Sequence, residues 1–230
     1  MMKSVKEGID FLLDKYNVNK CVEQADGETA VIDGKKCALL PWRCERRFIE
    51  LKSLAADSLK GISAIRVGRI DKKDADIMKM FRREADICEF ISGSAVKEIF
   101  AVANGSKAMN VIMKLDNGII CTLELAAVLN DGEHTVDKHE IIAQKGVACD
   151  RAVDTQVPQS SIYVFTGDDK EEYLDVDAEL YGLSADEAAA ARQCFEMARD
   201  GYCLCGQAAH LDEIVSACRR SADTEENVIL

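Results

Sequence analysis

The sequence has no long apolar segment and no excess of basic residues, and each absence excludes a class of protein. Its longest apolar runs are well short of the ~20 residues that a membrane-spanning helix requires. With 29 Lys and Arg against 41 Asp and Glu, the formal net charge is −12, which would repel the phosphates of a nucleic acid. Residues 1–14 lack the basic segment and apolar core of a signal peptide. We therefore expect a cytoplasmic protein that binds neither membranes nor nucleic acids.

Metal ligands and nucleophile motifs are also scarce. The three histidines, His134, His139 and His210, are far apart in the sequence, so we interpret them as surface or hydrogen-bonded core residues. Cys203 and Cys205 offer two thiolates, whereas a closed zinc site needs four ligands. No G-x-S-x-G turn accompanies a histidine. We predict no metal site and no Ser-His-Asp triad; a redox role for the C-x-C pair stays open.

The ten cysteines are mostly scattered among apolar neighbours. A chain of 230 residues can bury a core large enough to need no disulfides, and buried free thiols pack as small hydrophobic groups. We therefore expect reduced cysteines.

The apolar spacing predicts helices first and then a sheet. Helical periodicity occurs at residues 5–16, 45–59, 75–92, 185–200 and 207–222. Short strands are expected between residues 20 and 40, and further strands at 62–70, 96–103, 109–115, 119–128, 139–143, 147–149, 161–166 and 172–176. Asn117-Gly118 supplies the positive backbone angles of a tight hairpin turn. Asp200-Gly201 predicts the end of a helix.

These elements predict an α+β fold. A predominantly antiparallel, mixed open sheet of about six strands would carry helices on one face. The composition changes near residues 59–61, so we divide the chain into residues 1–60 and a sheet domain at 61–230.

Several short motifs follow one another along the second part of the chain. They are Arg46-Arg47-Phe48 with Gly61-Ile62, Leu115-Asp116-Asn117-Gly118, His139 to Ile142 with Lys145-Gly146, and Cys194-Phe195 with Gly201, Ala208 and residues 221–230. In their order and spacing they resemble the C-terminal domain of the glucose–fructose oxidoreductase/inositol dehydrogenase (Gfo/Idh/MocA) family, over roughly residues 46–230. The resemblance implies a dehydrogenase-like protein whose residues 1–60 are a truncated remnant of a Rossmann-like region.

The nucleotide-binding signature of that family is missing. Full members begin with a Gly-rich loop between a strand and a helix, where backbone amides hold the pyrophosphate. This sequence has no G-x-G-x-x-G, and the 45 residues before the domain are too few for several strand–helix units of ~30 residues. We expect no cofactor on this chain, with NAD(P) supplied only through a partner subunit.

The family's catalytic positions can be compared one at a time. Its E-K-P motif supplies a lysine, and the best counterpart is Glu23-Gln24-Ala25, which places Gln24 at that position. Its H-x-x-D motif supplies an acid/base histidine, and the counterpart begins at Arg83 and keeps Asp86. Arginine retains its proton at ordinary pH, so it cannot exchange one with a substrate hydroxyl. The resemblance therefore implies that this chain alone does not transfer hydride.

Two basic groups are candidates for binding a sugar-like or anionic small molecule. They comprise Trp42, Arg43, Arg46 and Arg47, followed by Lys52, and on a later helix Arg82 and Arg83. If the resemblance holds, both groups would face one cleft, where guanidinium groups bind anions in a bidentate manner. The alternative is that they are solvated helix faces paired with Glu45, Glu50 or Glu84.

The strand at 119–128 suggests how the chain assembles. Ile119, Cys121, Leu123 and Leu125 alternate with Ile120, Thr122, Glu124 and Ala126, so both faces of the strand are largely apolar. Helices covering one face would leave the other exposed. We predict a homodimer through the open face of the sheet, as the resemblance also implies.

Two functions remain open. The chain is either an accessory or substrate-binding subunit for a cofactor-bearing partner protein, or a non-enzymatic ligand-binding or structural module that reuses the fold.

Overall fold

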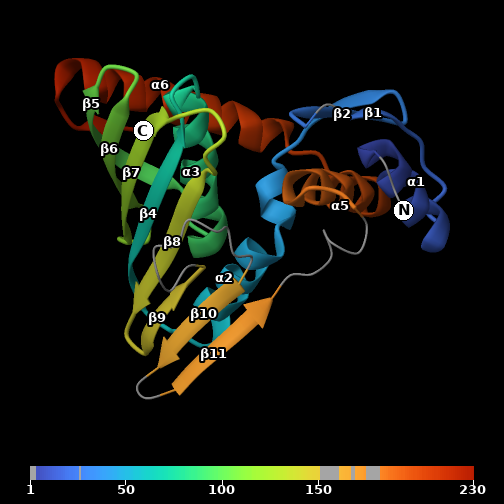
Figure 1. Cartoon of the computed structure of the whole chain (residues 1–230), viewed down its shortest axis with the longest axis horizontal. Helices are drawn as coiled ribbons and strands as arrows, with labels where there is room; N and C mark the ends of the chain where they lie inside the picture. The colour runs from blue at the N-terminus through green and yellow to red at the C-terminus, as the bar shows by residue number, and fades with distance from the viewer. Residues whose placement is uncertain (1–3, 26, 151–160, 167–168, 175–181) are drawn as a thin grey trace. The chain divides into compact units, whose positions relative to one another are not determined.

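The computed structural model describes residues 4–25, 27–150, 161–166, 169–174 and 182–230. The chain forms two compact units, shown in Figure 1. The first comprises Met1–Ile49 and Asp175–His210, and the second comprises Glu50–Leu174 and Leu211–Leu230. The helix predicted at 185–200 therefore groups with the N-terminal elements, whereas the sequence placed it with the sheet after residue 60.

The first unit packs two helices with a small antiparallel sheet. Its elements are α1 (Val5–Lys15), β1 (Val22–Ala25), β2 (Thr29–Ile32), β3 (Lys35–Ala38), the 3-10 helix η1 (Pro41–Cys44) and α5 (Ala185–Asp200). The strands lie in the order β1-β2-β3, in the region where short strands were predicted. α5 begins with a capping box between Ser184 and Glu187 and ends at Gly201, whose φ of 72° is left-handed.

The core of the first unit joins α1, the small sheet and α5. It contains Ile9, Leu13, Val22, Ala30, Ile32, Cys37, Leu39, Ala191, Cys194, Phe195, Met197 and Ala198. Gln193 of α5 is buried, and its amide accepts from Leu40 N at 2.6 Å and donates to Leu40 O at 2.8 Å. This pairing satisfies both ends of a buried amide and fixes the chain before η1 against α5.

The second unit contains a mixed nine-stranded sheet with the order β11-β10-β9-β8-β4-β7-β6-β5-β12. The strands are β4 (Ile62–Lys72), β5 (Val96–Asn104), β6 (Ala108–Leu115), β7 (Ile120–Leu129), β8 (Val136–Ala143), β9 (Gly146–Cys149), β10 (Ser161–Thr166), β11 (Asp169–Leu174) and β12 (Val228–Ile229). The α+β class and the mixed sheet are confirmed. The sheet has nine strands and not about six: β10 and β11, near the strands expected at 161–166 and 172–176, continue it beyond β9, and the two-residue β12 pairs with β5.

β4 lies at the centre of this sheet. It runs parallel to β7 and antiparallel to β8, while β6 and β7 form the predicted antiparallel hairpin, with Gly118 at a φ of 86°. Helix α3 (Ile77–Ser92) packs against β4, β6 and β7. The C-terminal part of α6 (Cys205–Thr224) covers β5 and β6, where Ser221 Oγ accepts from Ala101 N at 2.9 Å. α2 (Arg46–Asp57), like α6, begins in the first unit and continues in the second.

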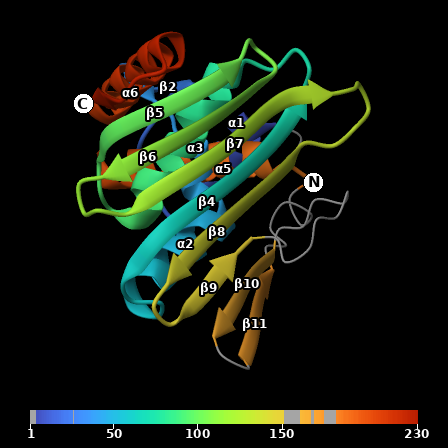
Figure 2. The same ribbon diagram turned by 90° about the vertical axis from the view of Figure 1, so that its left-hand side faces the viewer.

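The helices of the second unit lie on one side of its sheet. In Figure 2 the strands β5, β6, β7, β4 and β8 face the viewer and α3 lies behind them. Burial follows this arrangement: Cys121, Leu123 and Leu125 of β7 are buried, whereas Ile120 and Glu124 are exposed. The predicted alternation along this strand is therefore confirmed.

No helix in the described ranges is long and apolar enough to cross a membrane. All ten cysteines are free; seven are buried, and Cys21, Cys203 and Cys205 are exposed.

Candidate functional site

The structure places the predicted site residues in two groups. Gln24 lies on β1; Trp42 and Arg43 lie on η1; and Arg46 and Arg47 begin α2, all in the first unit. Arg82, Arg83 and Asp86 lie on α3 in the second unit. Each group lies within one unit. That both groups face one cleft, as the resemblance implies, stays a prediction.

Arg47 and Arg82 each have an ion-pair partner, and the partner of Arg47 is the Glu45 that the alternative interpretation named. Arg47 Nε donates to Glu45 Oε2 at 2.8 Å, and the Arg47 guanidinium lies 4.5 Å from the Phe48 ring centroid. Arg82 Nε lies 3.3 Å from Asp212 Oδ1, whose side chain is 73% exposed. An exposed pair such as Arg82–Asp212 contributes little to stability, whereas the Arg47–Glu45 pair is largely buried. Arg82 and Arg47 are thus occupied by carboxylates within their own units.

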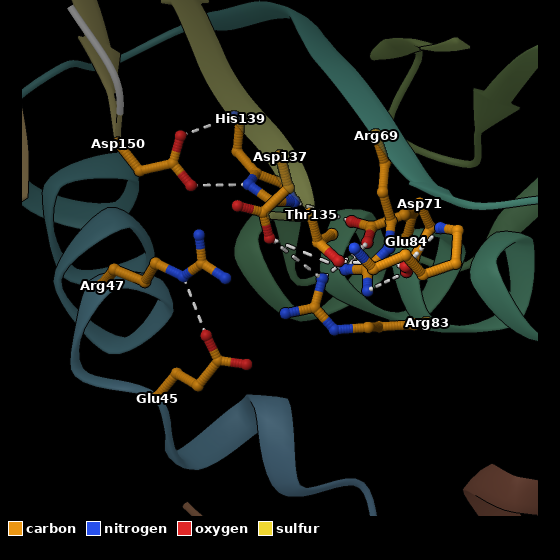
Figure 3. Close-up of polar contacts among 11 residues, drawn as sticks. Glu45, Arg47, Arg69, Asp71, Arg83, Glu84, Thr135, Asp137, His139 and Asp150 are labelled. Atoms are coloured by element: carbon orange, nitrogen blue, oxygen red, sulfur yellow. Dashed lines mark hydrogen bonds and ion pairs between the residues drawn. The ribbon is translucent and has the colours of Figure 1, made fainter. Parts of the chain in front are cut away.

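Arg83 belongs to a buried network of charged side chains under the sheet, shown in Figure 3. α3 begins at Asp76, whose side chain accepts from Met78 N and Lys79 N, and ends at the left-handed Gly93. Between these caps the helix turns Glu84 toward the sheet, where it is fully buried. Arg83 Nη1 donates to Glu84 Oε1 at 2.6 Å.

The strands supply the other members of the network. β4 and β8 pair antiparallel so that Arg69 lies opposite Asp137 and Val67 opposite His139. Because side chains alternate along a strand, Asp137 and His139 point to the same face of β8, toward the helix. This register places Arg69, Asp137 and His139 between the sheet and the helix, where the alternation along the strands predicts apolar side chains.

His139 lies between two carboxylates at the centre of the network. Its Nε2 is 2.7 Å from Glu84 Oε2, and its Nδ1 is 2.6 Å from Asp150 Oδ2. Asp150 also accepts from His139 N at 2.7 Å and donates its own N–H to His139 O at 3.1 Å. An imidazole with an acceptor at each nitrogen is satisfied best when both nitrogens carry a proton.

The surroundings set the protonation of His139 and Glu84. Burial by itself would lower the pKa of His139, but the charges of Asp150 and Glu84 raise it to about 9. Burial by itself would raise the pKa of Glu84, but Arg83, His139 and Arg69 bring it well below its ordinary value. The pair is therefore an imidazolium and a carboxylate at neutral pH.

Arg69 connects the network to the end of β4. Its Nη1 lies 3.2 Å from Glu84 Oε1 and its Nη2 3.0 Å from Asp71 Oδ2. Burial would raise the pKa of Asp71, but hydrogen bonds from Lys72 N and Thr135 Oγ1, together with Arg69, lower it. Among the described residues, Arg69 Nε is the buried side-chain atom that has no hydrogen-bond partner.

The network contains four carboxylates and three cations, joined by ion pairs of 2.6–3.7 Å. Both ring nitrogens of His139 are engaged by carboxylates, and its proton stays bound until the pH approaches 9. Arg83 also keeps its proton. Neither residue is placed to accept a proton from a substrate, so the network holds α3 on β4 and β8 electrostatically.

Sequence reasoning found only part of this site. It identified Arg83, considered Glu84 as its partner and interpreted His139 as a surface or hydrogen-bonded core residue; the structure places His139 in the core and pairs Arg83 with Glu84. It did not identify Asp150, Asp137 or Arg69. The available signal was the polar residues at the inward positions of the strand 136–143, which interrupt its apolar alternation. Asp86 is also fully buried, within α3.

The open face of the sheet carries a shallow hollow of about 660 Å³. Polar groups of Asn104, Asn110, Glu124 and Lys138 lie on its walls with apolar side chains that include Val102. The described residues contain no group of three or more His, Cys, Asp or Glu side chains suited to a metal ion.

Comparison with known proteins links the chain to oxidoreductases at the level of the fold. No protein-family model matches the sequence, and no curated protein matches it. An oxidoreductase domain protein from Kribbella flavida superposes with a TM-score of 0.66 at 12% identity, over 83% of this chain and 64% of that one. A myo-inositol dehydrogenase from Corynebacterium glutamicum gives 0.59 at 19% identity, over 83% and 63%.

An inositol dehydrogenase homologue from Azotobacter vinelandii, solved with NADH and myo-inositol, gives a TM-score of 0.63 at 13% identity. The match covers 84% of this chain and 64% of that structure. The chain thus spans less than two thirds of these structures. The resemblance to Gfo/Idh/MocA-type proteins is confirmed for the fold, which hosts dehydrogenases in these neighbours.

Proposed function

We propose that this chain is an accessory subunit with an oxidoreductase-type fold, which lends a substrate-binding or oligomerising surface to a partner that carries NAD(P). In this role the chain does not transfer hydride alone. The fold is that of dehydrogenases, but fold does not fix function, so the proposal depends on the residues at the site.

The observation that carries the proposal is the state of Arg83. This residue stands on α3 where the resemblance expects an acid/base histidine, three positions before Asp86. Its guanidinium is held by Glu84 at 2.6 Å and lies 3.7 Å from Asp137 Oδ2. A group that keeps its proton and is tied to two carboxylates cannot act as a general base.

The described part of the first unit also supports the proposal that a partner, and not this chain, carries the nucleotide. Residues 4–25 and 27–49 form α1, an antiparallel three-stranded sheet, η1 and the start of α2. Rossmann-like folds, which bind nucleotides, instead use parallel strands and a Gly-rich turn before a helix. Gln24 on β1 stands where the resemblance expects a lysine. The interpretation of residues 1–60 as a Rossmann-like remnant stays a prediction.

A binding titration tests the proposal. We expect no stabilisation of the chain by NAD or NADP in a thermal-shift or calorimetric titration. A response to one member of a sugar panel would favour the accessory, substrate-binding role. No response to any sugar would favour the alternative structural module, and nucleotide binding would contradict the proposal.

We also propose that the open face of the sheet forms a homodimer. Apolar side chains there are exposed, including Ile112 at 49%, with Ile70, Val102 and Ile120. The same sheet carries an ion pair of Arg66 with Glu140 on β4 and β8, and Lys114 of β6 lies opposite Glu98 of β5. A patch that contains both signs of charge can complement a copy of itself around a two-fold axis.

Light scattering after size exclusion checks this assembly. We expect a dimer at micromolar concentration and a Kd at least about a hundredfold higher for Ile112→Asp, because burying an unpaired charge costs about 3 kcal/mol. Phe11→Asp, at a residue that is 41% exposed on α1, is the matched control and should remain dimeric. A wild-type chain that stays monomeric at micromolar concentration would disprove the dimer.

A further inference from the structure

A cluster of thiols in the first unit lies outside the site described above. Cys203 and Cys205 are exposed and follow the end of α5 at Gly201. Their Sγ atoms are 2.9 Å apart and share a hydrogen bond. Cys37 of β3 is buried beside them and hydrogen-bonds to Cys203. Three thiols from two distant segments of the chain therefore meet at one place.

The separation of the two exposed sulfurs is close to that of a covalent pair. A disulfide bond measures ~2.05 Å, so about 0.9 Å of movement would join the sulfurs. Residues 202–204 are not helical, and α6 begins only at Cys205. The rearrangement is therefore confined to the loop before α6, whose first hydrogen bond runs from Ala208 N to Leu204 O at 2.8 Å.

The environment favours a thiolate at Cys203. Burial would raise its pKa, but hydrogen bonds from the Cys205 thiol and backbone N–H, the Cys37 thiol and the Ala38 N–H lower it. Cys203 also precedes the N-terminus of α6, where the helix dipole stabilises negative charge. Burial, by contrast, raises the pKa of Cys37 to about 11, which keeps that thiol protonated as a donor.

We propose that Cys203 and Cys205 form a reversible dithiol–disulfide site that is oxidised by low-molecular-weight disulfides, with Cys203 as the attacking thiol and Cys205 as the resolving thiol. The Cys203 thiolate attacks one sulfur of the small disulfide, forming a mixed disulfide and releasing one thiolate. Cys205, having lost its proton to solvent, then attacks Cys203 Sγ and releases the second thiolate. The protein loses two electrons and two protons, and the small disulfide becomes two thiols.

The spacing also predicts that the bond is easily reduced. A disulfide across a single intervening residue closes a small, strained ring, and strained, exposed disulfides are the labile ones. The site would therefore follow the thiol–disulfide balance of its surroundings. This inference is independent of the proposed oxidoreductase-type role, since it involves none of the residues of the buried network.

Peptide mapping of the whole chain tests the site. After incubation with glutathione disulfide, the free thiols are alkylated in denaturant and the chain is cleaved with trypsin. The peptide of residues 200–219 contains Cys203, Cys205 and the buried Cys218. We expect it to carry one alkyl group in place of three and an internal disulfide, and to regain all three after treatment with excess reduced glutathione.

Two variants distinguish the proposal from general thiol reactivity. Cys205→Ser should accumulate a glutathione adduct at Cys203, because the resolving thiol is missing. Cys21, an exposed thiol with no cysteine near it in sequence, is the matched reference, and Cys21→Ser should leave the internal disulfide unchanged. Separate glutathione adducts on Cys203 and Cys205, a disulfide between Cys203 and Cys37, or a Cys203 that reacts no faster than Cys21 would each overturn the proposal.

Discussion

Replacing Glu84 with glutamine will lower the free energy of unfolding of the second unit by about 3–5 kcal/mol. The substitution keeps the size of the side chain, so it opens no cavity. It removes the carboxylate that faces His139 at 2.7 Å, Arg83 at 2.6 Å and Arg69 at 3.2 Å. Breaking a buried ion pair by removing one partner costs this much, because a desolvated charge loses its compensation.

Hydrogen exchange is the suitable measurement, because a chain with two compact units need not unfold in one transition. The exchange of amides in β4 and β8 reports the opening of the unit that contains the network. Glu140→Gln is the matched control: Glu140 lies on the open face of β8 and pairs with Arg66, which is 65% exposed. Its effect should stay within about 0.5 kcal/mol. If both variants lost the same free energy of unfolding, the buried network would contribute no more than an exposed ion pair.

The stability of the second unit will fall by about 2 kcal/mol between pH 5.5 and pH 8 through His139 alone. Its folded pKa of about 9 is above the ordinary value of 6.5, so its contribution is complete below pH 6.5 and is lost as the pH rises toward 9. Each pH unit in this window removes up to about 1.4 kcal/mol. Glu84 acts in the opposite direction: its lowered pKa stabilises the fold above pH 4.5, and this contribution is lost on acidification.

His139→Gln separates this effect from other titrations. The variant should be less stable than the wild type at pH 5.5, and its stability should be nearly constant up to pH 8, below the range in which most thiols ionise. His134→Gln, at an exposed histidine, should follow the wild-type profile. If His139→Gln shows the same loss of stability with rising pH as the wild type, then His139 is not a buried imidazolium.

The parts of the fold that local chemistry determines could be predicted from the sequence. Asn117-Gly118 fixed the β6–β7 hairpin because few residues adopt its backbone angles. Gly201 marked the end of α5 for a similar reason. The alternation in β7 correctly separated its buried face from its exposed face.

The rest depends on contacts between residues distant in the sequence. No local signal shows that β4 lies between β7 and β8, and this register alone places Arg69 opposite Asp137 and brings His139 to Glu84. In the sequence, Glu84 resembles any acidic residue of an amphipathic helix. The grouping of α5 with the N-terminal elements likewise follows from packing between distant segments: α5 contacts α1 and β1, and its Gln193 accepts from Leu40 N, 153 positions earlier.

We propose that a dehydrogenase-type fold is present here without hydride-transfer chemistry of its own. The most direct measurement is nucleotide reduction by the purified chain, followed by the absorbance of the reduced nicotinamide, with NAD or NADP and a panel of inositols, other polyols and aldoses. We expect no reduction above the rate without protein for any pair, because Arg83 cannot accept the substrate's proton. Saturable reduction of either nucleotide by the chain alone would contradict it.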